Sequence, residues 1–129
     1  VFLRPTMPTR NPEEITECLS MLMLNPEADC VRTTCPVPYP PYWMKRINEE
    51  GLLEPFCDDV RPYQYTRSQD LPETIMCDGY VDVCRVPAIR KYRQIVAGNI
   101  LACHRKDRFF VDLDEDKDWL YAEYLMKNK

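Results

Sequence analysis

Four aspartates stand at alternate positions near the end of the chain, in the segment FFVDLDEDKDWLYAEYL that covers residues 109–125. They are Asp112, Asp114, Asp116 and Asp118. An EF-hand calcium loop is excluded on two counts. Lys117 occupies the position that requires glycine, and an apolar, strand-like run stands where a helix should precede the loop.

Two interpretations of the aspartates remain open. Side chains of a strand alternate between its faces, so a strand ending in D-x-D would carry the carboxylates of Asp112 and Asp114 on one side. Ligands of open α/β sheets bind at that end of the strands, and two carboxylates there suit Mg²⁺. Alternatively, all four aspartates only cap and solvate the helix that follows, where negative charge stabilises the first turn.

Composition limits the class of protein. The chain has 129 residues, of which 45% are apolar and 29% charged, with a net charge of −4. These values predict one soluble globular domain, and the negative charge argues against a nucleic-acid partner. No apolar run approaches the roughly 18 residues of a membrane span. The seven cysteines have irregular spacing without a CxxC pair, which argues against zinc and indicates reduced thiols in the cytoplasm.

Local signals predict the elements that would position the aspartates. Residues 1–3 resemble the end of a buried strand. Asn11 is a good N-cap and Pro12 suits the first helical position of a helix that ends near Leu24. Apolar residues at helical spacing form one face of this helix, namely Ile15, Cys18, Leu19, Leu22 and Met23.

The remainder of the chain alternates between short strands and helices. We expect a strand at 28–35, two short strands around a turn at 50–51, a loop over 60–74, and strands within 75–86 that are broken at 78–79. A helix at 87–96, strands at 99–104 and 108–114, and a final helix at about 115–127 follow. This order predicts an α/β protein with a looser, β-rich excursion at about 36–85.

Four blocks of the sequence resemble, in the same order, those of the acylneuraminate cytidylyltransferase family, which comprises the CMP-sialic-acid-synthetase-like enzymes. FLRPTMPTR resembles the family's LQPTSPLR, and TRSQDLP resembles its R-x-Q-D-L-P. CDGYVDV stands where the family has N-G, and FFVDLDEDKDWLYAEYL resembles its S-[IV]-D-I-D ending. The likeness extends over nearly all 129 residues.

The resemblance implies a Rossmann-like nucleotide-diphospho-sugar transferase fold with a protruding segment that pairs two subunits in a homodimer. It implies an enzyme that transfers CMP from CTP to an acidic, sialic-acid-like α-keto acid sugar and releases pyrophosphate. Asp112 and Asp114 match the aspartates that hold the catalytic Mg²⁺. The ion would polarise the α-phosphate and offset the charge that develops in the transition state.

Further residues are assigned by their match to the family's motifs. Arg10 matches the arginine that closes the LQPTSPLR loop and is expected to be catalytic. Lys45 falls near a lysine close to the active site, and Arg67 and Gln69 match the R-x-Q segment that approaches the sugar. An arginine suits a sugar carboxylate because its guanidinium binds both oxygens. The arginines and Lys45 could equally be ordinary surface or loop charges.

Two of the expected substrate-binding residues depart from the family pattern. Arg4 replaces a glutamine that touches the sugar in many members, and Asp78 replaces the asparagine of N-G. Met76 stands where some members carry an arginine for the carboxylate. These departures indicate a different acidic or modified sugar.

The family's first segment, a Gly/Ser/Lys-rich loop that holds the CTP phosphates, has no counterpart in this sequence. The three glycines are isolated, so they cannot form a phosphate-binding loop. We therefore expect an N-terminally truncated domain, lacking about 80 residues by the usual size of α/β domains, that has no turnover alone. The alternative hypothesis is a non-catalytic remnant that dimerises or docks through its Pro- and Tyr-rich segment.

Overall fold

The computed structural model describes residues 1–57, 67–105 and 111–128. The chain divides into two compact units. The first contains Val1–Cys35 and Cys77–Lys129, and the second contains Pro36–Met76.

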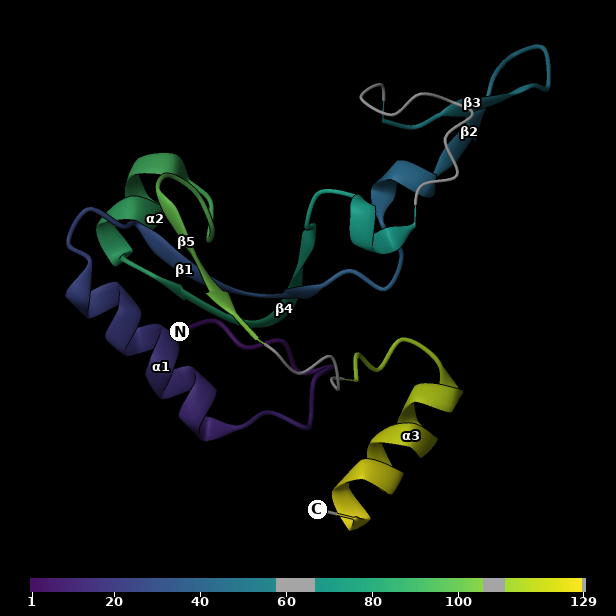
Figure 1. Ribbon diagram of the computed structural model, residues 1–129. Helices are drawn as coiled ribbons and strands as arrows, with labels where there is room; N and C mark the ends of the chain where they lie inside the picture. Colours follow the sequence, from purple (N-terminus) through teal and green to yellow (C-terminus); the bar gives the residue numbers. More distant parts are fainter. Residues whose placement is uncertain (58–66, 106–110, 129) are drawn as a thin grey trace. The chain divides into compact units, whose positions relative to one another are not determined.

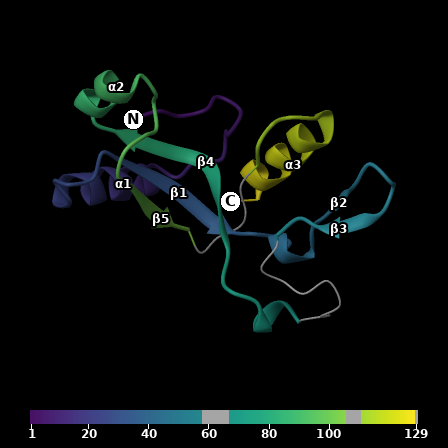
Figure 2. The same ribbon diagram turned by 90° about the horizontal axis from the view of Figure 1, so that it is seen from above.

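A three-stranded sheet with the strand order β4-β1-β5 forms the centre of the first unit. Its strands are β1 (Cys30–Pro36), β4 (Ile75–Cys84) and β5 (Ile100–His104). β1 and β5 are parallel, with Cys30 opposite Ile100 and Thr34 opposite His104. The arrows of β1 and β4 point in opposite directions in Figure 2, so the sheet is mixed. The α/β class expected from the sequence is confirmed.

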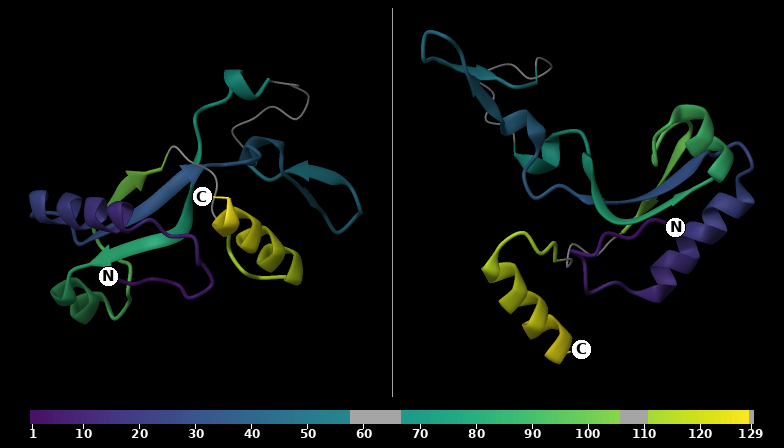
Figure 3. Two further views of the ribbon diagram at one scale, coloured as in Figure 1. Left: turned by 90° about the horizontal axis from the view of Figure 1, so that it is seen from below. Right: turned by 180° about the vertical axis from the view of Figure 1, so that it is seen from behind.

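Helix α1 (Pro12–Leu24) lies along one face of this sheet, as Figures 1 and 3 show. The Asn11 side chain accepts a hydrogen bond from the Glu13 N–H (3.0 Å) and caps the helix as predicted. Helix and strands bury one apolar cluster, consisting of Met7, Cys18, Leu22, Ala28, Val31, Tyr80, Val81, Val83 and Cys103. The first unit also contains α2 (Val86–Tyr92) and α3 (Asp116–Lys127).

The second unit contains the predicted pair of short strands. β2 (Lys45–Ile47) and β3 (Leu53–Pro55) are antiparallel. Gly51 occupies the turn with a φ of +82°, a left-handed conformation that favours glycine. Two 3₁₀ turns, η1 (Pro41–Trp43) and η2 (Ser68–Asp70), complete the regular structure described here.

Four predictions about elements were wrong. Residues 1–3 are exposed and form an isolated bridge to Asp82 rather than a buried strand. β4 runs unbroken through Gly79, although this residue adopts a φ of +71° within the strand. α2 ends at Tyr92, because Arg93 is left-handed (φ 57°). Residues 111–114 form no strand, and the preceding part of that predicted strand lies outside the described residues.

None of the helices in the described parts of the chain is both long and apolar enough to cross a membrane.

Candidate functional site

The segment with the D-x-D pattern is attached to the loop at residues 4–10. The Leu113 N–H donates a hydrogen bond to the carbonyl oxygen of Thr6 (2.9 Å), and the Asp114 N–H donates to the Asp112 carbonyl (3.1 Å). Two of the four blocks singled out in the sequence, FLRPTMPTR and FFVDLD, are therefore in direct contact. Asp112, Arg10 and Arg4 all belong to this region.

Asp112 differs from the other three aspartates in the burial and hydrogen bonding of its carboxylate. Its Oδ1 atom is buried and has no hydrogen-bond partner among the residues that the structure describes. A buried polar oxygen without a partner costs about 1–3 kcal/mol. Such an oxygen indicates either strain or a ligand that completes its coordination.

The remaining aspartates have exposed or structural positions. Asp118 accepts hydrogen bonds from the N–H groups of Asp114 (3.1 Å) and Glu115 (2.7 Å), forming a capping box with Glu115 at the start of α3. Asp114 and Asp116 are exposed. The capping interpretation thus holds for Asp118, whereas Asp112 contributes nothing of that kind.

Arg10 organises the loop that precedes α1. Its Nε donates to the Tyr80 carbonyl oxygen (2.6 Å), and its Nη1 donates to that of Met7 (2.8 Å). Its Nη2 donates to the carbonyl oxygen of Arg4. Burial lowers the pKa of the guanidinium, while the charges of Tyr80 and Asp112 oppose that shift. Arg10 therefore holds the loop together and places a positive charge near Asp112.

Arg4 packs its exposed guanidinium against Gly79. A Cβ atom at position 79 would lie 2.8 Å from Arg4 Cζ and 2.9 Å from Nη1. The positive φ favours glycine at this position. The absence of a side chain at Gly79 leaves room for the Arg4 guanidinium beside it.

Asp78 is fully engaged with protein groups. Its Oδ1 accepts hydrogen bonds from Thr33 Oγ1 (2.5 Å) and the Tyr80 N–H (3.0 Å), and its Oδ2 pairs with Arg105 Nη1 (3.0 Å). The Asp78 side chain has 0% exposure. These contacts make it part of a buried polar network rather than a surface that faces a ligand.

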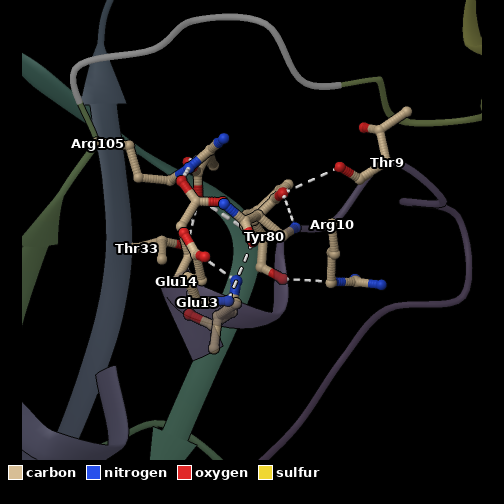
Figure 4. Close-up of polar contacts among 10 residues, drawn as sticks. Thr9, Arg10, Glu13, Glu14, Thr33, Tyr80 and Arg105 are labelled. Carbon is tan, nitrogen blue, oxygen red and sulfur yellow. Dashed lines mark hydrogen bonds and ion pairs between the residues drawn. The ribbon is translucent and has the colours of Figure 1, made fainter. Parts of the chain in front are cut away.

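Arg105 lies at the centre of this network, which Figure 4 shows. Its Nε pairs with Glu14 Oε1 on α1 (2.7 Å), and its guanidinium stacks on the Tyr80 ring at 3.7 Å. Burial alone would lower the pKa of Arg105, but the carboxylates of Glu14 and Asp78 raise it above its usual value. The residue is only 6% exposed.

Arg105 was not among the residues singled out from the sequence. One signal was available in the alternation of β5 and its continuation, because Leu101, Cys103 and Arg105 occupy the same side by period two. The structure buries Cys103 and Arg105 and leaves His104 exposed.

The other predicted substrate residues belong to the second unit. Lys45 is exposed at the start of β2. Arg67 and Gln69 are exposed, and the Arg67 carbonyl accepts a hydrogen bond from the Asp70 N–H (2.9 Å) at η2. Residues 58–66, which precede Arg67, lie outside the described residues.

The site fits a Mg²⁺ ion that is held by few protein ligands. Within the described residues, no group of three or more His, Cys, Asp or Glu side chains could hold a metal ion. Mg²⁺ needs only one or two carboxylates when waters and substrate phosphates complete its octahedron. The Oδ1 of Asp112, which has no partner among the described residues, and the exposed carboxylate of Asp114 are the groups that could hold such an ion.

No protein-family model matches the chain, and no curated protein matches it in sequence.

Proposed function

We propose that this chain supplies the magnesium site and the sugar side of a nucleotidyltransferase that transfers CMP from CTP to an acidic α-keto acid sugar and releases pyrophosphate. The resemblance of four ordered blocks supports the class of reaction. The contact between Thr6 and Leu113 supports it further, because it joins the first and last of these blocks. The observation that carries the proposal is the buried Oδ1 of Asp112, which has no hydrogen-bond partner among the described residues.

Four residues of the first unit have a specific role in this proposal. Asp112 and Asp114 hold the ion, which when bound polarises the α-phosphate and offsets the charge on the departing pyrophosphate. Arg10 fixes the loop and directs positive charge toward the same phosphate. The exposed guanidinium of Arg4, seated on Gly79, presents paired N–H donors to the sugar carboxylate.

Cation binding by the chain tests the metal site directly. A titration with Mn²⁺, monitored by electron paramagnetic resonance, should reveal a binding site from which Mg²⁺ displaces the Mn²⁺ ion. Asp112→Asn should weaken binding by about tenfold or more, because it removes a charged ligand. Asp116→Asn makes the same charge change at an exposed position and should leave the affinity within about twofold. Equal affinities in the two variants would sink the proposal.

Turnover needs a group that binds the CTP phosphates, and the sequence contains no glycine-rich loop of the kind that would do so. Gly51, Gly79 and Gly98 are separate in the sequence, and each has a positive φ in its own local turn or strand. We therefore expect no CMP-sugar when the 129-residue chain is incubated with CTP, Mg²⁺ and sialic-acid-like sugars. Product detected by mass spectrometry would show that the chain is complete as an enzyme.

We also propose that the second unit pairs with a second copy of itself in a homodimer. Ile47 and Leu53 face each other across β2 and β3, with 73% and 71% of their surfaces exposed. Other exposed apolar residues of this unit are Tyr39, Trp43, Met44, Leu52 and Phe56. Apolar surface gathered in this way marks an interface.

Sedimentation velocity tests the dimer, with Ile47→Glu expected to give monomers whose Mn²⁺ binding is unchanged. A chain that dimerises but has no cation site would instead be a non-catalytic interaction module. A wild-type chain that stays monomeric at high micromolar concentration would refute the dimer.

A further inference from the structure

Tyr80 holds three consecutive residues of the loop that carries Arg10. Its hydroxyl accepts a hydrogen bond from the Asn11 N–H (2.6 Å) and donates one to the Thr9 carbonyl (3.1 Å). Its own carbonyl accepts the hydrogen bond from Arg10 Nε (2.6 Å). Figure 4 shows the contacts of Tyr80 with Thr9 and Arg10.

The position of Tyr80 is fixed from the opposite side by the buried ionic network. Arg105 stacks on its ring at 3.7 Å, and Asp78 accepts its backbone N–H (3.0 Å). Tyr80 is only 2% exposed and belongs to the apolar cluster of the first unit. The hydroxyl is therefore a rigid anchor for the loop.

The loop in turn determines where the aspartates lie. Arg10 ties Met7 and Arg4 to the same framework, and the Thr6 carbonyl receives the N–H of Leu113 (2.9 Å). Because Leu113 lies between Asp112 and Asp114, a shift of the loop moves both carboxylates.

We infer that Tyr80 is a positioning residue for the cation site: its hydroxyl fixes the loop that orients Asp112 and Asp114 without itself touching the ion. This inference rests on the proposed function. Groups that hold metal ligands in place typically change metal affinity by about 10- to 100-fold when they are removed. Tyr80 acts through the loop backbone, so we expect an effect near the lower limit.

The variant Tyr80→Phe removes the hydroxyl and keeps the ring that stacks on Arg105. In the full chain, it should weaken Mn²⁺ binding by about tenfold. Binding is measured at a temperature where circular dichroism shows every variant to be folded. Tyr124→Phe, at an exposed position of α3, is the matched control and should bind as the wild type does.

The unmodified chain offers a second measurement that does not depend on the folding of a variant. Coupling between two sites is reciprocal, so a cation that benefits from the contact between Asn11 and Tyr80 must stabilise that contact. Saturating Mg²⁺ should slow the hydrogen exchange of the Asn11 amide by about the same factor as the loss of affinity in Tyr80→Phe, roughly tenfold.

The outcomes separate this inference from the proposed function. If Asp112→Asn loses binding but Tyr80→Phe binds as the wild type does, the metal site stands and the positioning role is refuted. Unchanged exchange of the Asn11 amide on addition of Mg²⁺ refutes it as well, even if Tyr80→Phe fails to fold. If the wild-type chain binds no Mn²⁺, the proposed function and this inference both fail.

Discussion

Replacement of Arg105 by methionine should lower the free energy of unfolding by about 3–5 kcal/mol, because it leaves a buried carboxylate without its counter-charge. Arg105 pairs with Glu14 at 2.7 Å and with Asp78 at 3.0 Å. The Glu14 side chain is 22% exposed and can turn toward water, whereas that of Asp78 is 0% exposed. Most of the loss therefore arises from Asp78.

Urea denaturation followed by circular dichroism measures this loss. Lys117→Met serves as the control, since Lys117 and Glu115 are 73% and 64% exposed and such pairs contribute less than about 1 kcal/mol. Addition of Asp78→Asn to Arg105→Met should recover at least about 1 kcal/mol, because the whole ion pair is then removed. Asparagine also keeps one oxygen for the N–H of Tyr80.

Two results would refute this reasoning. Arg105→Met could lower the free energy of unfolding by no more than Lys117→Met does, which would mean that the buried ionic network contributes little to stability. Alternatively, the double variant could be less stable than Arg105→Met, which would mean that Asp78 stabilises the fold without its charge partner. Total stabilities are about 5–15 kcal/mol. If Arg105→Met alone is too unstable to fold, recovery of a folded double variant still decides the question.

Three further predictions concern neighbouring residues. Burial, together with the Glu14 carboxylate, raises the pKa of Tyr80 to about 12. A tyrosine in the unfolded chain titrates near pH 10, so the raised pKa stabilises the fold fully below pH 10, and this contribution is lost as the pH rises toward 12. Alkaline denaturation curves of Tyr80→Phe should therefore lack this loss of stability. Gly79→Ala should cost about 1–2 kcal/mol in urea denaturation because its φ is +71°, and a loss below about 0.5 kcal/mol would contradict that backbone. Asp118→Ala should cost about 1 kcal/mol through loss of the α3 cap and lower the melting temperature, whereas Asp116→Ala should not.

Elements determined by neighbouring residues could be predicted from the sequence. Asn11 and Pro12 specify the start of α1 through local hydrogen bonding and a fixed backbone angle, and both Asn11 as N-cap and the start at Pro12 are as expected. The prediction that β4 is broken at 78–79 was wrong because contacts with a distant part of the chain decide the outcome. Gly79 is typical of a turn, yet the Asp78 side chain accepts hydrogen bonds from the Tyr80 N–H on its own strand and from the Thr33 hydroxyl on β1, which keeps the strand continuous.

The burial of Arg105 could likewise not be predicted from neighbouring residues. In sequence it stands between a histidine and a lysine, which favours a surface position. Its burial depends on Glu14, 91 residues away, and on Asp78, 27 residues away. A buried cation is stable only when such partners converge on it, and no local pattern reports where those partners lie.

The four alternate aspartates show why spacing alone could not decide between a metal site and a helix cap. Spacing makes the four residues equivalent, but their surroundings do not. The Oδ2 of Asp118 accepts hydrogen bonds from two backbone N–H groups, so capping of the helix is enough to explain an aspartate at this position. Asp112 has a buried oxygen without a partner in the described part of the chain. A helix cap needs no such oxygen, whereas a divalent cation does, and this difference favours the metal interpretation for Asp112 over the helix cap.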